Sequence, residues 1–229
     1  MNLQSTSPSV IILHVFQEIK MEIEMKYAVP GKEIADAIWN DSDVNEMSDF
    51  SSAESVIMKA VYFDTENGDL KKNHFSVRIR MEGERRFATL KWGGSAGKNG
   101  LHQRNEVNIP VSDDSYFIQF DPTIFLVCEE GQHLLDIIDN KPLVNLLEMR
   151  FIRRRKRIAF KNSVMELSLD NGSIITDEGD IPISEMEIEL FSGQQEAIEA
   201  LGDILAEKYN LQPKLSSKYS DGLALLNEK

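Results

Sequence analysis

Three charged residues at alternate positions, Glu22, Glu24 and Lys26, are the part of this chain most suited to chemistry. Strand side chains alternate between two faces, so an extended segment presents acid, acid and base together and turns Ile23 and Met25 the other way. Neighbouring carboxylates repel each other unless a cation lies between them, which predicts a divalent-metal site beside a lysine. The alternative is an amphipathic strand whose charged face is solvated.

The same alternation recurs along the chain and separates the charges by sign. Arginine or lysine takes alternate positions in 76–82 and 150–160, whereas glutamate or aspartate does so in 164–170 and 184–190. A solvated sheet face usually mixes signs across neighbouring strands. The separation favours a bound anion beside a bound cation, in a closed barrel with a polar lumen and apolar faces packed outward against helices. An ordinary sandwich or filled barrel, with its charges in water, is the alternative.

Period-two alternation between turn residues predicts a mainly β chain with flanking helices, of the α+β class. The expected strands are 21–29, 56–64, 74–82, 85–92, 101–111, 150–160, 163–170, 173–176 and 183–191. Tight turns are expected at 82–84 and 170–172, and a flexible loop at 93–100. Helical patterns are fewer, and they cover 31–40, 131–139, 142–147 and 194–209.

Composition excludes several classes of protein. The net charge of −13 argues against a nucleic-acid-coating or membrane-surface protein, because both usually need a basic face. The single cysteine, Cys128, excludes an intramolecular disulfide and a thiolate zinc cluster, and fits a reducing, cytoplasmic location. The four histidines show no metal-ligand spacing. Because no long polar linker divides the chain, we expect 21–229 to form one domain.

Residues 1–20 differ from the rest of the chain. They are rich in serine and then carry a short apolar run, Val10 to Phe16, that is too short to span a bilayer and lacks the features of a signal peptide. We expect Met21 to be the natural start and 1–20 to be an upstream extension. The alternative is a real edge strand or arm.

Spaced motifs from about Met21 to the C-terminus match one family. An opening Glu-x-Glu-x-Lys is followed by segments at 62–65 with Leu70, 76–80, 89–92, 104–106, 166–172, 183–193, 217–219 and 222–223. On these residues the chain resembles the CYTH group, the triphosphate tunnel metalloenzymes. The segment 141–144 followed by 151–153 resembles the inorganic triphosphatase branch in particular. Asp221 departs from that branch, in which a basic residue is common, and this puts the far end of the substrate site in doubt.

The resemblance implies a fold and an activity. The fold is an eight-stranded antiparallel closed β-barrel that forms a tunnel. The activity is metal-dependent hydrolysis of a triphosphate, and the 141–153 segment favours tripolyphosphate cleaved to pyrophosphate and phosphate. We expect a small-molecule triphosphate as partner, neither nucleic acid nor a membrane, and a monomer or homodimer.

Roles for the charged residues follow from their chemistry within that tunnel. Arginine forks and lysine point charges suit phosphate oxygens, and the predicted substrate ligands are Lys26, Arg78, Arg80, Lys91, Arg104, Arg153, Arg155 and Lys218. Carboxylates suit Mg²⁺ or Mn²⁺, and the predicted metal ligands are Glu22, Glu24, Glu185, Glu187 and Glu189. Glu24, Lys26 and Arg80 are the predicted catalytic residues. Glu106 and Asp170 are expected to orient basic residues, and Lys156 and Arg157 are weaker candidates.

Other functions stay open at this point. A thiamine or nucleoside triphosphatase would need a pocket for the organic group at the tunnel mouth. A class IV-type adenylate cyclase would need an adenine pocket, and no residue demands one. A non-catalytic polyphosphate- or nucleotide-binding module would keep the basic lining, but the five predicted metal-binding glutamates argue against it.

Overall fold

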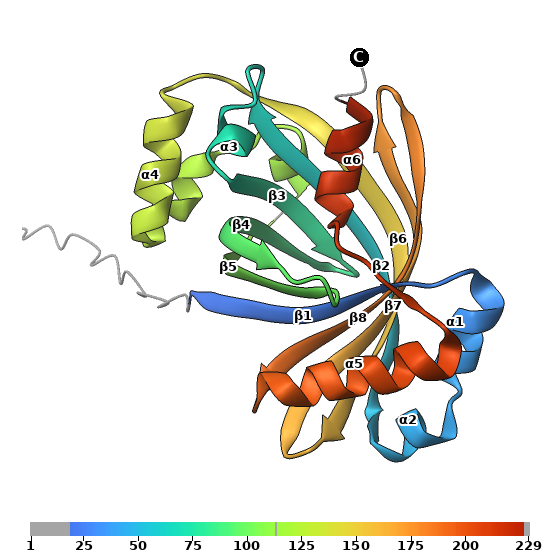
Figure 1. Ribbon diagram of the computed structural model, residues 1–229. Coiled ribbons are helices and arrows are strands. Elements are labelled where there is room, and N and C mark those ends of the chain that lie inside the picture. Colours follow the sequence, from blue (N-terminus) through green and yellow to red (C-terminus); the bar gives the residue numbers. More distant parts are fainter. Residues whose placement is uncertain (1–18, 113, 227–229) are drawn as a thin grey trace, which may run out of the picture.

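Eight antiparallel strands close into a barrel in the computed structural model, which describes residues 19–112 and 114–226 (Figure 1). The strands are β1 (Lys20–Ala28), β2 (Ser48–Thr65), β3 (Phe75–Glu82), β4 (Arg85–Ala96), β5 (Leu101–Pro110), β6 (Leu143–Phe160), β7 (Ser163–Thr176) and β8 (Gly179–Ser192). Their order is β5-β4-β3-β2-β6-β7-β8-β1, and β1 pairs with β5 again to close the sheet. The predicted eight-stranded barrel is confirmed. Most of the predicted 1–20 extension lies outside the described residues.

Helices pack around this barrel, and most of them cover its outside on two sides. They are α1 (Lys32–Trp39), α2 (Ser42–Glu46), α3 (Asp69–Lys72), α4 (Glu129–Ile138), α5 (Gln195–Tyr209), α6 (Lys218–Leu226) and the 3₁₀ turns η1 (Asp114–Phe117) and η2 (Pro122–Val127). A two-residue strand, β9 (Gln212–Pro213), extends β1. Helix α5 packs along β1 and β8, while α3 and α4 lie beside β3 (Figure 1). No helix within 19–112 or 114–226 is both long enough and apolar enough to cross a membrane.

The alternation in β1 sets the direction of its two faces. Glu24 and Lys26 line the interior of the barrel, whereas Met25 and Tyr27 pack outward in one core cluster with Leu201 of α5. Complete burial of an apolar side chain of this size contributes roughly 1.5–3 kcal/mol, so the outer face fixes which way the strand turns. The predicted arrangement, charges inward and apolar residues outward, is confirmed.

Helix α6 is the exception, because it packs against the inner side of the barrel. A Cβ on its Gly222 would lie 2.6 Å from a methyl carbon of Leu147 of β6 and 3.0 Å from one of Ile174 of β7, so a larger residue here would require these side chains to move. The helix begins at Lys218 and carries Tyr219, and both side chains line the interior cavity. Thus a residue at the end of the chain can act at the centre of the fold.

The predicted helix at 142–147 is wrong, because this segment begins β6. Leu143 lies opposite Thr65 and Leu147 opposite Tyr62, with a register shift between these pairs. Leu143 and Leu147 have a helix-like spacing in the sequence, and the register shift accommodates this spacing within a strand. The partner strand is distant in sequence, so the local pattern cannot show the pairing.

The predicted turn at 170–172 is also wrong, because β7 runs unbroken from Ser163 to Thr176 and joins the two strands predicted there. A Cβ on Gly172 would lie 2.2 Å from the carbonyl oxygen of Arg150. This glycine therefore serves the close approach of β6 and not a reversal of the chain.

Two other strands, β4 and β2, are longer than the sequence predicts. Strand β4 continues through part of the expected 93–100 loop to Ala96, with a register shift between Trp92 and Ser95. Strand β2 begins at Ser48 and not at 56, with a register shift between Asp49 and Glu54. The turn at 82–84 is confirmed, and Gly83 has a φ of 58° there.

Candidate active site

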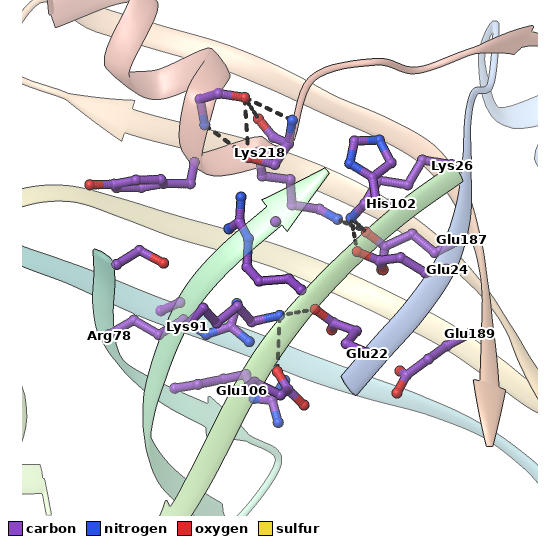
Figure 2. A pocket seen from close by; sticks show the side chains of 18 of the residues that line it. Glu22, Glu24, Lys26, Arg78, Lys91, His102, Glu106, Glu187, Glu189 and Lys218 are labelled. Atoms are coloured by element: carbon purple, nitrogen blue, oxygen red, sulfur yellow. Dashed lines mark hydrogen bonds and ion pairs between the residues drawn. The ribbon is translucent and has the colours of Figure 1, made fainter. Parts of the chain in front are cut away.

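A cavity of about 870 Å³ lies inside the barrel and is lined by the charged strand faces (Figure 2). The predicted site residues that line it are Glu22, Glu24, Lys26, Arg78, Arg80, Lys91, Arg104, Glu106, Arg153, Arg155, Glu187, Glu189 and Lys218. Glu185 and Asp170 are not among its lining residues and are 1% and 3% exposed. Of the weaker candidates, Lys156 points outward to the backbone oxygen of Trp39, and Arg157 is exposed.

Three arginines on β3 and β5, Arg78, Arg80 and Arg104, form what we call the arginine wall. Within the described parts of the chain, no carboxylate lies within 4.0 Å of the guanidinium groups of Arg78 or Arg104, and Arg80 meets only Glu82, at 3.4 Å. The buried Nε atoms of Arg78 and Arg80 have no partner among the same residues. Burial, and then the neighbouring Arg78, lower the pKa of Arg80. These guanidinium groups keep free donors for an anion.

A second set of cations is already neutralised by carboxylates. Lys26, Arg153, Arg155 and Lys218, which we call the ion-pair wall, each contact at least two carboxylates. Arg153 donates two hydrogen bonds to Asp170, at 2.8 and 2.7 Å. These bonds hold the guanidinium group of Arg153 in place, and the supporting role of Asp170 in catalysis stays a prediction.

Lys218 is the most completely paired member of this wall. Its Nζ contacts Asp170 at 2.7 Å, Glu187 at 2.9 Å, and Glu185 as well. Although burial opposes the shift, Lys218, Lys26 and Arg153 hold the pKa of Glu187 well below its usual range. The ion-pair wall therefore carries its own counter-charges.

Three glutamates on β1 and β8 form an acidic corner, composed of Glu22, Glu24 and Glu189. Glu24 and Glu189 lie directly opposite each other in the β1–β8 ladder. Burial raises the pKa of Glu24 to about 8, with Glu22 and Glu187 adding to the rise and Lys26 opposing it. Burial, and then Glu22, raise the pKa of Glu189. Such mutual repulsion among buried carboxylates is relieved by a bound cation.

The five predicted metal ligands do not form one tight cluster. Among the described residues, the group whose ligand atoms all lie within 4.8 Å of one another is Asp170, Glu185 and Glu187. The ammonium group of Lys218 contacts all three, and Lys26, Arg153 and Lys214 make further ion pairs with them, so this group is already neutralised.

The carboxylates of the acidic corner also have lysine partners, because Glu24 contacts Lys26 at 3.0 Å, Glu189 contacts Lys20 at 2.6 Å, and Glu22 contacts Lys91. The acidic corner is still the better candidate for a hard divalent cation, because all three of its carboxylates line the cavity and Glu22 raises the pKa of the other two.

Lys91 and Glu106 connect the acidic corner to the arginine wall. The Nζ atom of Lys91 lies 3.0 Å from Glu106 and also contacts Glu22 (Figure 2). Although burial opposes the shift, Lys91 and Arg78 lower the pKa of Glu106 to about 2. Glu106 and Lys91 thus hold each other in place, and the supporting role of Glu106 in catalysis stays a prediction.

Some lining residues escaped prediction from the sequence. Tyr62 and Tyr219 line the cavity with Met58, Met149 and Phe151, so part of the wall is aromatic and apolar. Period-two alternation along β2, in which Met58 and Tyr62 share a face, is a signal that could have revealed the first tyrosine.

Comparison with known proteins agrees with this architecture. Residues 20–222 match the CYTH domain. The chain belongs to the CYTH domain family. An inorganic triphosphatase of Haemophilus influenzae is 30% identical over 140 residues, which cover 61% of this chain and 38% of that protein. This CYTH chain therefore matches about two fifths of the length of that relative.

Solved structures share the fold. A candidate adenylyl cyclase of Hippeastrum, described as having a dominant triphosphatase activity, aligns with a TM-score of 0.63 at 17% identity and covers 89% of this chain and 95% of its own. A candidate adenylate cyclase of Bacillus halodurans aligns with a TM-score of 0.58 at 20% identity, over 87% of this chain and 95% of its own. At these identities the likeness concerns the CYTH fold alone.

Proposed function

We propose that this CYTH protein is a divalent-metal-dependent triphosphatase, with tripolyphosphate as its first substrate. The observation that carries the proposal is one cavity that contains both an arginine wall, whose one carboxylate contact among the described residues is that of Arg80 with Glu82 at 3.4 Å, and an acidic corner of mutually repelling carboxylates. The first suits the oxygens of a phosphate chain and the second suits Mg²⁺ or Mn²⁺. The similarity to an inorganic triphosphatase supports the choice of substrate.

The residues divide the work of phosphoryl transfer. Arg78, Arg80 and Arg104 bind the phosphate oxygens and stabilise the charge that develops on them. Lys91, oriented by Glu106, adds a point charge between the arginines and the acidic corner. A glutamate of the acidic corner accepts the proton of the attacking water as the phosphoanhydride bond breaks and pyrophosphate leaves.

The acidic corner would hold the divalent cation through Glu22, Glu24 and Glu189. When bound, such an ion neutralises phosphate charge and polarises the reacting oxygens. The ion pairs of the ion-pair wall stabilise the barrel. In one of them, the Nζ atom of Lys26 lies 2.6 Å from a carboxylate oxygen of Glu187. The sequence also predicts four direct substrate ligands in the ion-pair wall: Lys26, Arg153, Arg155 and Lys218. These roles stay predictions, and each of the four side chains would have to bind phosphate while it contacts carboxylates.

A second substrate class is favoured by one feature of the cavity. Met58, Met149 and Phe151 give it an apolar section, which an organic triphosphate such as thiamine triphosphate or ATP would contact. Its volume of about 870 Å³ lies within the roughly 300–1,000 Å³ of pockets that enclose organic ligands.

The test is phosphate release from tripolyphosphate, ATP and thiamine triphosphate with Mg²⁺ or Mn²⁺, with cyclic AMP measured beside phosphate. We expect release from tripolyphosphate, dependence on the metal, and loss of activity in Glu24→Gln. The matched control is Glu33→Gln, which changes an exposed glutamate of α1 and should leave the rate unchanged. Purified protein that released phosphate from none of the three substrates would refute the enzyme proposal.

A further inference from the structure

Two tyrosines from distant parts of the chain stack inside the cavity. Tyr62 of β2 and Tyr219 of α6 have ring centroids 4.7 Å apart and ring planes within 20° of parallel. They are 5% and 9% exposed, and both line the cavity. The stack places two phenol groups where the aromatic and apolar section of the cavity meets Arg78.

The hydroxyl groups of this pair are incompletely bonded. The Tyr219 hydroxyl has no hydrogen-bond partner among the described residues, although its oxygen is buried. The Tyr62 hydroxyl accepts a hydrogen bond from Arg78 at 3.0 Å, and within the described chain no acceptor receives its own hydrogen. Buried polar groups are nearly always paired, so two such hydrogens beside a cavity indicate a ligand that accepts them.

The two hydroxyls differ in their electrostatic surroundings. Burial and then Asp64 raise the pKa of Tyr219, and Arg104 opposes the rise, whereas the surroundings of Tyr62 are positively charged. Burial would raise the pKa of Tyr62, but Arg78, Lys91 and Arg104 together lower it. Arg104 faces the same cavity without a carboxylate within 4.0 Å in the described residues. Hydroxyl and guanidinium donors that converge at a site of positive potential favour an anionic oxygen as acceptor, such as an oxygen of a phosphoryl group.

We propose that the hydroxyl groups of Tyr62 and Tyr219, with Arg78 and Arg104, form a subsite for one phosphoryl group of the phosphate chain. The subsite rests on the proposed function for its substrate. Because Tyr219 lies on α6, it also makes the inner helix part of substrate binding. The tyrosines are positioning residues in this proposal, since they donate to oxygens that keep their bonds to phosphorus.

The test removes single hydroxyl groups and keeps the rings. Tripolyphosphate binding is measured by titration calorimetry, with EDTA to prevent hydrolysis, for wild type, Tyr219→Phe and Tyr62→Phe. We expect Tyr219→Phe to bind roughly tenfold more weakly, because it loses a hydrogen bond to a charged acceptor. The matched control is Tyr27→Phe, which removes another buried, unpartnered hydroxyl that lies on the outer face of β1 and should leave binding unchanged.

A kinetic readout separates positioning from packing. In Mg²⁺, Tyr219→Phe should raise KM with a smaller change in kcat, and its thermal midpoint should match that of Tyr27→Phe. Tyr62→Phe gives an independent measurement if Tyr219→Phe unfolds. Binding and KM equal to wild type in both variants would overturn the subsite.

The proposed function and the subsite can fail separately. Weaker binding in the two variants, without any hydrolysis by wild type, would keep the subsite and refute the triphosphatase. Hydrolysis that is insensitive to both substitutions would keep the enzyme and refute the subsite. A wild-type chain that binds no tripolyphosphate, with EDTA or with Mg²⁺, would refute both.

Discussion

The arginine wall and the ion-pair wall line the same cavity with the same kinds of side chain, yet they differ in what neutralises them. Arg78 and Arg104 have no carboxylate within 4.0 Å among the described residues, whereas Lys218 contacts three carboxylates and Arg153 contacts two. The density of positive charge alone therefore does not identify an anion site. The placement of the carboxylates does.

This difference has a physical cost on one side. A buried cation that lacks a counter-ion destabilises the folded protein. Where a buried cation has several hydrogen-bonded carboxylate partners, its removal destabilises the protein, because the carboxylates are left without a counter-ion. The arginine wall would therefore keep charge available for a ligand at the expense of stability. The ion-pair wall would hold β6, β7, β8 and α6 together.

The largest expected effect is on catalysis by the arginine wall. We expect Arg80→Ala to lower kcat/KM for tripolyphosphate by about 10²- to 10³-fold, because it removes donors to the charge that develops on the phosphate oxygens. Steady-state phosphate release measures this effect. Arg157→Ala removes an exposed arginine of β6 and should retain wild-type kinetics. Similar losses in the two variants would erase the distinction between lining and exposed arginines.

The second expected effect is on stability, and it should have opposite signs in the two walls. We expect Lys218→Met to lower the free energy of unfolding by about 3–5 kcal/mol, because it leaves three buried carboxylates without that partner. Arg80→Met should leave stability unchanged or raise it, since burial and Arg78 disfavour the charge of Arg80. Denaturant unfolding at pH 7 without phosphate measures both, and a larger loss in Arg80→Met would reverse our assignment of the walls.

A smaller effect is expected from pH through Glu106, which joins the two regions. Its folded-state pKa of about 2 lies below the usual 4.5, so its stabilising contribution is complete above pH 4.5 and is lost as the pH falls toward 2. The stability difference between wild type and Glu106→Gln should therefore shrink over that range, from at most about 3 kcal/mol. Unfolding curves at several pH values measure it, and a constant difference would show that Glu106 is not held by Lys91 and Arg78.

The sequence was sufficient for the barrel and for the direction of its charged faces. The alternation at Glu22, Glu24 and Lys26 and the pairing of charged positions along β3 predict which side chains face inward, because strand geometry has a period of two. It could not assign ion-pair partners. Lys218 and Asp170 meet only because α6 packs inside the barrel, and Gly222, which permits that packing, gives no such signal in one sequence.

The metal ligands show the same limit. Glu185, Glu187 and Glu189 share a strand face, so their sequence pattern treats them alike. In the fold, Glu185 contacts Lys214 and Lys218, whereas Glu189 lies opposite Glu24 and contacts Lys20 at 2.6 Å. Which glutamates repel each other, and so favour a cation, depends on the neighbours that β1 and α6 bring to them.

The measurement that tests our central claim most directly is a crystal structure of the Glu24→Gln variant with tripolyphosphate. We predict phosphate oxygens within hydrogen-bond distance of Arg78, Arg80 and Arg104, with the contacts of Lys218 to Asp170 and Glu187 retained. Phosphates bound to Lys218 and Arg153 with those ion pairs broken, or bound outside the barrel, would contradict the account.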